Sequence, residues 1–301
     1  MKLPFEYSSI ESDMVGKRFA VYRNRIGSQR FRKLVEFDMK EGGEAEGVSE
    51  WNVEEGSLKV VHSPKDGFYE FGGLEVVNGK VCMSGYHSVE KGSMYKVMMS
   101  EVSPIGEDFG LCISSHKDYE EALPGIYKSL DKAGFKGPVN VVVGGCKNVD
   151  AGKVHETGNV KVITSEVNHM GFTALSEVSD VKPYWMLLHD TCSVDSDFVA
   201  KASSIDIGLN PDMVLFGDAD EKLEIGLYSA EYVKGLDLGL RSVGMLKKLV
   251  ENASVVVESI SVPNYKGEDD VYGSGIMRKV LEMDRVGVRK YVGRRMVGGR
   301  P

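Results

Sequence analysis

The chain has 301 residues, and its content of 42% hydrophobic and 27% charged residues excludes a disordered protein. Its net charge of −8 argues against nucleic-acid binding by the molecule as a whole. The charge is uneven, because Met277–Pro301 holds eight basic and two acidic residues. This basic end indicates an anionic ligand, a peripheral contact with an anionic membrane surface, or a solvated tail.

The cysteines indicate reduced thiols. Cys82, Cys112, Cys146 and Cys192 are widely separated and include no C-x-x-C pair, which disfavours a zinc knuckle or a disulfide framework. The first residues lack an apolar signal segment, and no apolar run approaches the length of a transmembrane helix. We therefore expect a cytoplasmic protein without a transmembrane segment.

The first hundred residues have the rhythm of an all-β domain. Short β-rich pieces recur about every ten residues, separated by Gly, Asn, Asp and Ser. The predicted strands include 33–39, 57–63, 68–77, 80–89 and 95–102. Asn78-Gly79 predicts a hairpin turn. We expect a β-rich accessory domain over residues 1–104, and it contains no catalytic cluster.

After Pro104 the pattern changes to strands that alternate with helices. Continuous apolar runs predict strands at 109–115, 139–145, 160–166 and 184–190. A helix should start near Asp118 or, because Pro124 is tolerated only in a first turn, near Leu123, and it should stop at Gly134. A shorter helix is expected at 172–178. The alternation predicts an α/β domain with a parallel sheet over residues 105–301.

Polar residues and glycines lie at the end of each predicted strand of this second domain or shortly after it. They are Ser114, Ser115 and His116 for the first strand, Gly144 and Gly145 for the second, Asn168 and Gly171 for the third, and His189 and Asp190 for the fourth. Ligands bind at the carboxyl ends of strands in open α/β sheets, so we expect these residues to face one cleft. The sequence lacks G-x-G-x-x-G, P-loop and G-x-S-x-G motifs, which disfavours a Rossmann dehydrogenase, a P-loop kinase and a serine hydrolase.

From about Phe109 to Tyr291 the chain resembles nucleotide-sugar-dependent glycosyltransferases of the GT-A type. The resemblance rests on the order of "VNVVVGG", "NHMGFTALSE", "YWMLLHDTC" and "IGLYSAEYV". It implies a GT-A-like mixed, mostly parallel sheet flanked by helices, which binds the nucleotide through the strand-end residues before the fourth strand. It also implies transfer of a sugar from a nucleotide-diphosphate donor to a glycan or other hydroxyl acceptor.

The family carries an Asp-x-Asp metal motif where this chain has "HDTC". Cys192 stands in place of the second carboxylate, and Asp195-Ser196-Asp197 spells the motif only beyond the predicted strand end. The resemblance therefore assigns Asp190 to a Mn²⁺ or Mg²⁺ ion bound with the diphosphate. His189 would be a second ligand or a hydrogen-bond donor to the diphosphate. The structural alternative is that Asp190 caps the next turn.

An inverting transfer also needs a general base. We choose Asp269, over Glu268, in a Gly-flanked loop ahead of an apparent helix at 276–283. Glu258, at the end of an apolar run, is the competing base. Arg278 in the apparent helix could contact the diphosphate.

Two other functions stay open at this point. A nucleotidyltransferase would carry a Gly-rich basic loop after the first strand, and "SSHKDYEEA" is not one. A non-enzymatic glycan-binding or scaffold protein with a degenerate transferase domain is compatible with the incomplete metal motif. Metal-dependent hydrolysis of a nucleotide sugar would separate the enzyme from the scaffold.

Overall fold

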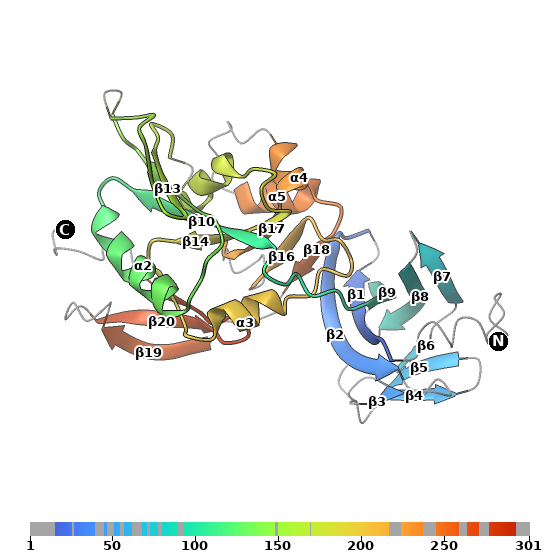
Figure 1. Ribbon diagram of the computed structural model, residues 1–301. Helices are drawn as coiled ribbons and strands as arrows, with labels where there is room; N and C mark the ends of the chain where they lie inside the picture. The colour runs from blue at the N-terminus through green and yellow to red at the C-terminus, as the bar shows by residue number, and fades with distance from the viewer. Residues whose placement is uncertain are drawn as a thin grey trace. The chain divides into compact units, whose positions relative to one another are not determined.

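The computed structural model describes most of the chain (Figure 1). The described residues are 16–25, 27–39, 45–46, 51–54, 57–61, 68–70, 73–77, 80–89, 93–147, 150–168, 170–216, 224–236, 245–258, 264–270 and 277–292. The chain divides into two compact units. The first is Met1–Ser103 with Asp206–Asn210, and the second is Pro104–Ile205 with Pro211–Pro301.

The described part of the first unit consists of β-strands, as the turn rhythm predicts. The strands are β1 (Arg18–Arg25), β2 (Arg30–Met39), β3 (Ala45–Glu46), β4 (Trp51–Glu54), β5 (Ser57–Val61), β6 (Phe68–Glu70), β7 (Gly73–Val77), β8 (Lys80–Val89) and β9 (Ser93–Glu101). Antiparallel strands follow the order β2-β1-β9-β8-β7, and β4-β5-β6 form a second sheet. Val77 pairs with Lys80, as a two-residue turn requires, although Asn78 and Gly79 themselves lie outside the described residues.

A carboxylate from the later half of the chain is buried in the first unit. Asp206, 6% exposed, accepts hydrogen bonds from the backbone N–H of Ser103 at 2.9 Å and of Gly208 at 2.8 Å. It also accepts one from the Tyr22 hydroxyl, and the Lys33 ammonium lies 3.2 Å away. Burial, followed by the charge of Asp206, raises the pKa of Tyr22 well above its ordinary value. This insertion had no counterpart in the sequence pattern.

The second unit contains all the described helices. Its elements are β10 (Phe109–His116), η1 (Glu120–Ala122), α2 (Leu123–Lys132), β11 (Val139–Gly144), β12 (Val154–Thr157), β13 (Val160–Thr164), η2 (Met170–Glu177), β14 (Tyr184–His189), β15 (Cys192–Val194), α3 (Phe198–Ser203), β16 (Met213–Leu215), β17 (Gly226–Ser229), α4 (Ala230–Lys234), α5 (Met245–Asn252), β18 (Val256–Glu258), β19 (Asn264–Asp270), β20 (Met277–Met283) and β21 (Val288–Val292).

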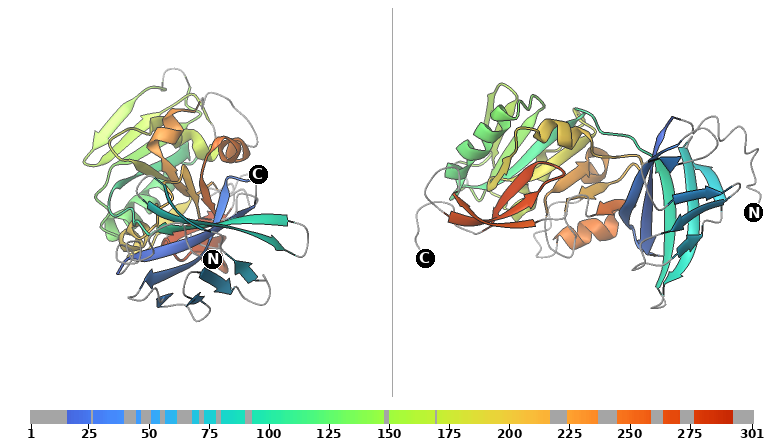
Figure 2. Two further views of the ribbon diagram at one scale, coloured as in Figure 1. Left: turned by 90° about the vertical axis from the view of Figure 1, so that its right-hand side faces the viewer. Right: turned by 90° about the horizontal axis from the view of Figure 1, so that it is seen from below.

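The strands of the second unit form a mixed sheet in the order β12-β13-β11-β10-β14-β17-β16-β18. Among these described strands all but β12 and β17 run in the same direction. A smaller antiparallel sheet follows the order β15-β21-β20-β19, drawn partly in red in Figure 2. The second unit is therefore a mixed α/β fold with a mostly parallel sheet, and its described helices are few and short.

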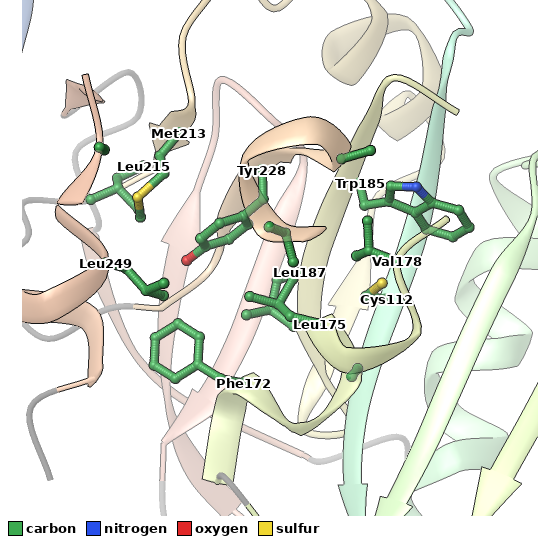
Figure 3. Close-up of a cluster of buried hydrophobic side chains, with 14 of the residues drawn as sticks. Cys112, Phe172, Leu175, Val178, Trp185, Leu187, Met213, Leu215, Tyr228 and Leu249 are labelled. Atoms are coloured by element: carbon green, nitrogen blue, oxygen red, sulfur yellow. The ribbon is translucent and has the colours of Figure 1, made fainter. Parts of the chain in front are cut away.

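Apolar residues on both faces make the central strands the core of this unit. All residues of β11 are buried, as are all but the last of β10 and of β14. Figure 3 shows Trp185 and Leu187 of β14 packed with Cys112, Val178 and side chains from η2, β17 and α5. Continuous apolar strands need cover on both faces, which explains why helices were expected between them.

Helix α2 confirms one of the two predicted starts. It begins at Leu123, with Pro124 in its first turn, and Gly134 follows its end with a φ of +72°. Asp118 does not cap it, because a 3₁₀ turn precedes the helix. Ile126 and Leu130 are buried, so one apolar face of the helix packs against the core.

The predicted helix at 276–283 is wrong. Its described residues, Met277–Met283, form strand β20, which pairs with β19 on one side and with β21 on the other. The segment expected to be a loop around Asp269 is strand β19. Val280 and Met283 are buried, and a spacing of three places two side chains on one face of a helix but on opposite faces of a strand. The non-local pairing with β21 decides for the strand.

Candidate functional site

Two buried polar side chains meet at the carboxyl ends of β10 and β14. The parallel register places Ser114 opposite His189, so Ser115 stands opposite Asp190 and projects from the same face. Ser115 Oγ donates a 2.8 Å hydrogen bond to Asp190 Oδ2, and the Asp190 N–H donates to Ser114 O at 3.0 Å. Ser115 and Asp190 are 6% and 7% exposed. Strand pairing thus holds a buried carboxylate at this edge of the sheet.

The environment of Asp190 disfavours its charged form. Burial raises the pKa of Asp190 above its ordinary value. The Ser115 hydroxyl, the charges of Lys290 and His189, and the Thr191 backbone N–H oppose this shift without cancelling it. A carboxyl group perturbed in this way, at a sheet edge where ligands bind, is a candidate for function.

His189 belongs to a second polar group. The Lys290 ammonium donates to His189 Nδ1 and, at 2.7 Å, to Thr191 Oγ1. His189 Nε2 lies 3.3 Å from Glu224 Oε2, which is close enough for an ion pair only when the imidazole is protonated. Burial, and then the charge of Lys290, lower the pKa of His189. Because an ammonium can only donate, Nδ1 accepts from Lys290, and the neutral form of the imidazole then has its proton on Nε2.

Lys290 and Glu224 are the site residues that sequence reasoning missed. Lys290 reaches the site because β21 pairs with β15, where Lys290 stands opposite Cys192 and the Tyr291 N–H donates to Thr191 O at 2.9 Å. The basic composition of the C-terminal region indicated that cationic side chains there could bind an anion, but it did not identify Lys290. No local motif marks Glu224.

Ser114 has a structural partner at the strand end. Its hydroxyl accepts a 3.0 Å hydrogen bond from the backbone N–H of Ala174, and the residue is 5% exposed. The hydroxyl thereby ties β10 to η2, the element that contains Gly171. Ser114 and Ser115, although adjacent in sequence, therefore serve opposite faces of the sheet.

The fold itself requires Gly144 and Gly145. A Cβ on Gly144 would lie 2.8 Å from Val167 O and 3.3 Å from the Cα of Asn168, so this loop approaches the strand closely. Gly145 has a φ of +75°, and a Cβ there would collide with the His116 ring. His116, both glycines and Asn168 thus lie together at the carboxyl ends of β10 and β11.

The structure does not bring the predicted bases to Asp190. Glu268 and Asp269, both exposed, lie on β19, opposite Lys279 and Arg278 of β20. Three strand intervals separate β19 from β15, which is about 14 Å. Glu258 ends β18 at the same edge as Asp190, again about three intervals, or 14 Å, from β14.

The donor set limits how a metal ion could bind. In the described part of the chain, no three His, Cys, Asp or Glu side chains are grouped to hold one. Asp190 and His189 contact different partners, and the Lys290 ammonium engages His189 Nδ1. These residues fit an ion only when a bound diphosphate and water supply most of its ligands.

The later Asp-x-Asp sequence lies beside an open hollow of about 400 Å³. The hollow is lined by Lys132, Val194, Asp195, Ser196, Asp197, Lys201 and Arg289. Arg289 pairs with Asp195 at 3.1 Å, and Lys201 pairs with Asp197 at 3.0 Å, so both carboxylates have cationic partners. A third such sequence, Asp218-Ala219-Asp220, follows β16 and lies outside the described residues.

No protein-family model and no curated protein matches the chain. Among solved structures it is similar to the crystal structure of S. aureus TarS 1-349, with 16% sequence identity and a TM-score of 0.36. The match covers 52% of this chain and 59% of that chain, so the chain spans less than two thirds of that structure. A likeness at this level does not bear on activity. None of the helices in the described ranges is long and apolar enough to cross a membrane.

Proposed function

We propose that this protein is a glycosyltransferase, which moves a sugar from a nucleotide-diphosphate donor to a glycan or other hydroxyl acceptor. The observation that carries the proposal is the buried carboxylate of Asp190 at the carboxyl end of β14, held by Ser115 of β10. This edge of an α/β sheet is where ligands bind. The nucleotide site is assigned to residues 105–301, and the β-rich residues 1–104 to an accessory role.

Several residues would bind and orient the donor at this edge. His116 and Asn168 border the edge beside Gly144 and Gly145. His189, with its proton on Nε2, suits a hydrogen-bond donor better than a metal ligand, since Lys290 engages Nδ1. A Mn²⁺ or Mg²⁺ ion that enters with the diphosphate would be held by Asp190 and would offset charge on the leaving group.

Asp269 is the proposed general base, with Glu268 and Glu258 as alternatives. Each needs the donor to extend about 14 Å from Asp190, because three strand intervals intervene. Glu224 enters as a further candidate because it lies beside His189. Arg278, opposite Asp269 on β20, would contact the acceptor side rather than a diphosphate at Asp190.

A panel of nucleotide sugars tests the proposal. Thermal unfolding of the intact protein would be measured with each nucleotide sugar, with and without Mn²⁺, for the wild type and for Asp190→Asn. Asp197→Asn is the matched control, since it removes one carboxylate that already pairs with Lys201. We expect at least one nucleotide sugar to raise the unfolding temperature of the wild type and of Asp197→Asn but not of Asp190→Asn.

Hydrolysis or transfer of that nucleotide sugar would then separate an enzyme from a scaffold. Binding of a glycan by the protein, with no nucleotide sugar bound or cleaved, would support the non-enzymatic alternative instead. Stabilisation of Asp190→Asn equal to that of the wild type would remove Asp190 from the site.

A further inference from the structure

The Lys290 ammonium is a partly buried cation whose two hydrogen-bond acceptors are not carboxylates. Its two hydrogen bonds go to the His189 imidazole and the Thr191 hydroxyl. Across the described residues, no carboxylate lies within salt-bridge distance of it. Glu224 stands on the far side of His189, and the Ser115 hydroxyl donates a hydrogen bond to Asp190.

This arrangement is unusual for a lysine. Removing an ammonium group from water costs free energy, and buried charges in proteins normally have an opposite charge beside them. The nearby Arg289 illustrates the usual solution, because it pairs with both Asp195 and Glu282. An ammonium has three donors, and two of the Lys290 donors are used. One donor and the positive charge are left for a ligand.

The position of Lys290 is well defined by the fold. It stands opposite Cys192 in the β15–β21 ladder, and its two hydrogen bonds hold the side chain against the residues that flank Asp190. A lysine restrained in this way loses little further side-chain entropy when an anion binds, which favours affinity.

We propose that Lys290 is the anion-binding residue of the strand-end site and receives a phosphate oxygen of a diphosphate. The identification of the anion as a diphosphate rests on the proposed function. The positive charge of Lys290 is present without a metal ion. It would therefore stabilise the negative charge on the leaving group even if a single protein carboxylate holds the metal weakly. It makes the C-terminal hairpin a part of the donor site.

The competing explanation is that Lys290 only balances the charge of Asp190, whose pKa it lowers. The two explanations differ when Asp190 is neutralised. If Lys290 only balances the charge of Asp190, its ammonium has no role once Asp190→Asn removes that charge. The Asp190→Asn/Lys290→Met double variant should then bind an anion as the wild type does. If Lys290 contacts the ligand, the double variant should bind as weakly as Lys290→Met.

Calorimetric titration of the intact protein with inorganic pyrophosphate, in EDTA, tests the proposal. We expect Lys290→Met to weaken binding about 10-fold or more and Lys290→Arg to retain most of it, because a charged donor is lost only in the first. Lys182→Met is the control. Lys182 lies just before β14, at the opposite end of the strand from Asp190, and pairs with Asp108. This variant loses the same charge and should bind like the wild type.

A second readout avoids the question of whether a variant folds. In wild-type protein with ¹³C-labelled lysine, the Cε signal assigned to Lys290 should shift during the pyrophosphate titration, and that of Lys182 should not. The proposal is overturned if wild-type protein does not bind pyrophosphate, if Lys290→Met binds it normally, or if the double variant recovers binding. Failure of every nucleotide sugar to bind, with a Lys290-dependent pyrophosphate site, would refute the transferase and leave the anion site standing.

Discussion

Replacing Ser115 with alanine tests whether this serine keeps Asp190 ionised. The hydroxyl donates a 2.8 Å hydrogen bond to the carboxylate, and both residues are less than a tenth exposed. A hydrogen bond to a charged partner contributes about 1.5–3 kcal/mol. We therefore expect Ser115→Ala to lower the free energy of unfolding by about 2 kcal/mol at neutral pH.

The loss should depend on pH because it depends on the charge of Asp190. Burial raises the pKa of Asp190 in the folded protein, so ionising this group subtracts stability as the pH rises through that pKa. Ser115 offsets part of that subtraction, and without it the pKa of Asp190 rises further. The difference in the free energy of unfolding between wild type and Ser115→Ala therefore reaches its full value above the pKa that Asp190 has in the folded variant. It shrinks at lower pH, where the carboxyl is protonated in both proteins.

Urea unfolding at intervals between about pH 4 and pH 8 would measure this difference. Ser114→Ala is the control, because it removes the acceptor of a neutral bond from the Ala174 N–H and should cost about the same at each pH. A Ser115→Ala cost that stayed constant with pH, or that fell below the cost of Ser114→Ala at neutral pH, would refute the reasoning.

Three further predictions concern the site and the fold. Asp190→Asn should abolish binding of a nucleoside diphosphate with Mn²⁺ in calorimetry. The variant should be at least as stable as the wild type in thermal unfolding at pH 7, because a neutral group avoids the cost of burying a charge. Loss of binding in Asp197→Asn alone would move the site to the later Asp-x-Asp sequence. Alanine variants of the proposed bases should include one whose turnover falls on the order of 10² to 10⁴-fold at unchanged donor affinity, and full transfer by all of them would end that assignment. The variants are those of Asp269, Glu268, Glu258 and Glu224. Asp206→Ala should cost about 3–5 kcal/mol in urea unfolding, since Tyr22 and Lys33 lose a buried acceptor, and a cost below about 1 kcal/mol would contradict the role given to this carboxylate.

The second unit was predictable where strands are apolar throughout. The runs that became β10, β11 and β14 have few alternatives, because a continuous apolar segment of this length must be buried on both faces. Segment 276–283 is not a continuous apolar run. Its mixture of charged and apolar residues suited a helix locally, and only the distant pairing of β20 with β21 made it a strand.

The site was predictable to the same extent. Ser115 and Asp190 could be anticipated because parallel strands bring their carboxyl ends to one edge. Lys290 and Glu224 could not, since neither is near Asp190 in sequence and no motif refers to them. Ser114 and Gly144 are predicted to contact a ligand, and the structure adds that each has a close contact within the chain.

The geometry also explains why the residue two positions after Asp190 is not a carboxylate. Cys192, in the place of the second carboxylate, is fully buried, and burial raises the pKa of its thiol. It stands in β15 opposite Lys290, inside the ladder that attaches the C-terminal hairpin. A carboxylate there would be desolvated within the core, at a cost of several kcal/mol. The chain therefore has an apolar residue at this position and, across the ladder, a lysine whose ammonium reaches the residues on either side of Asp190.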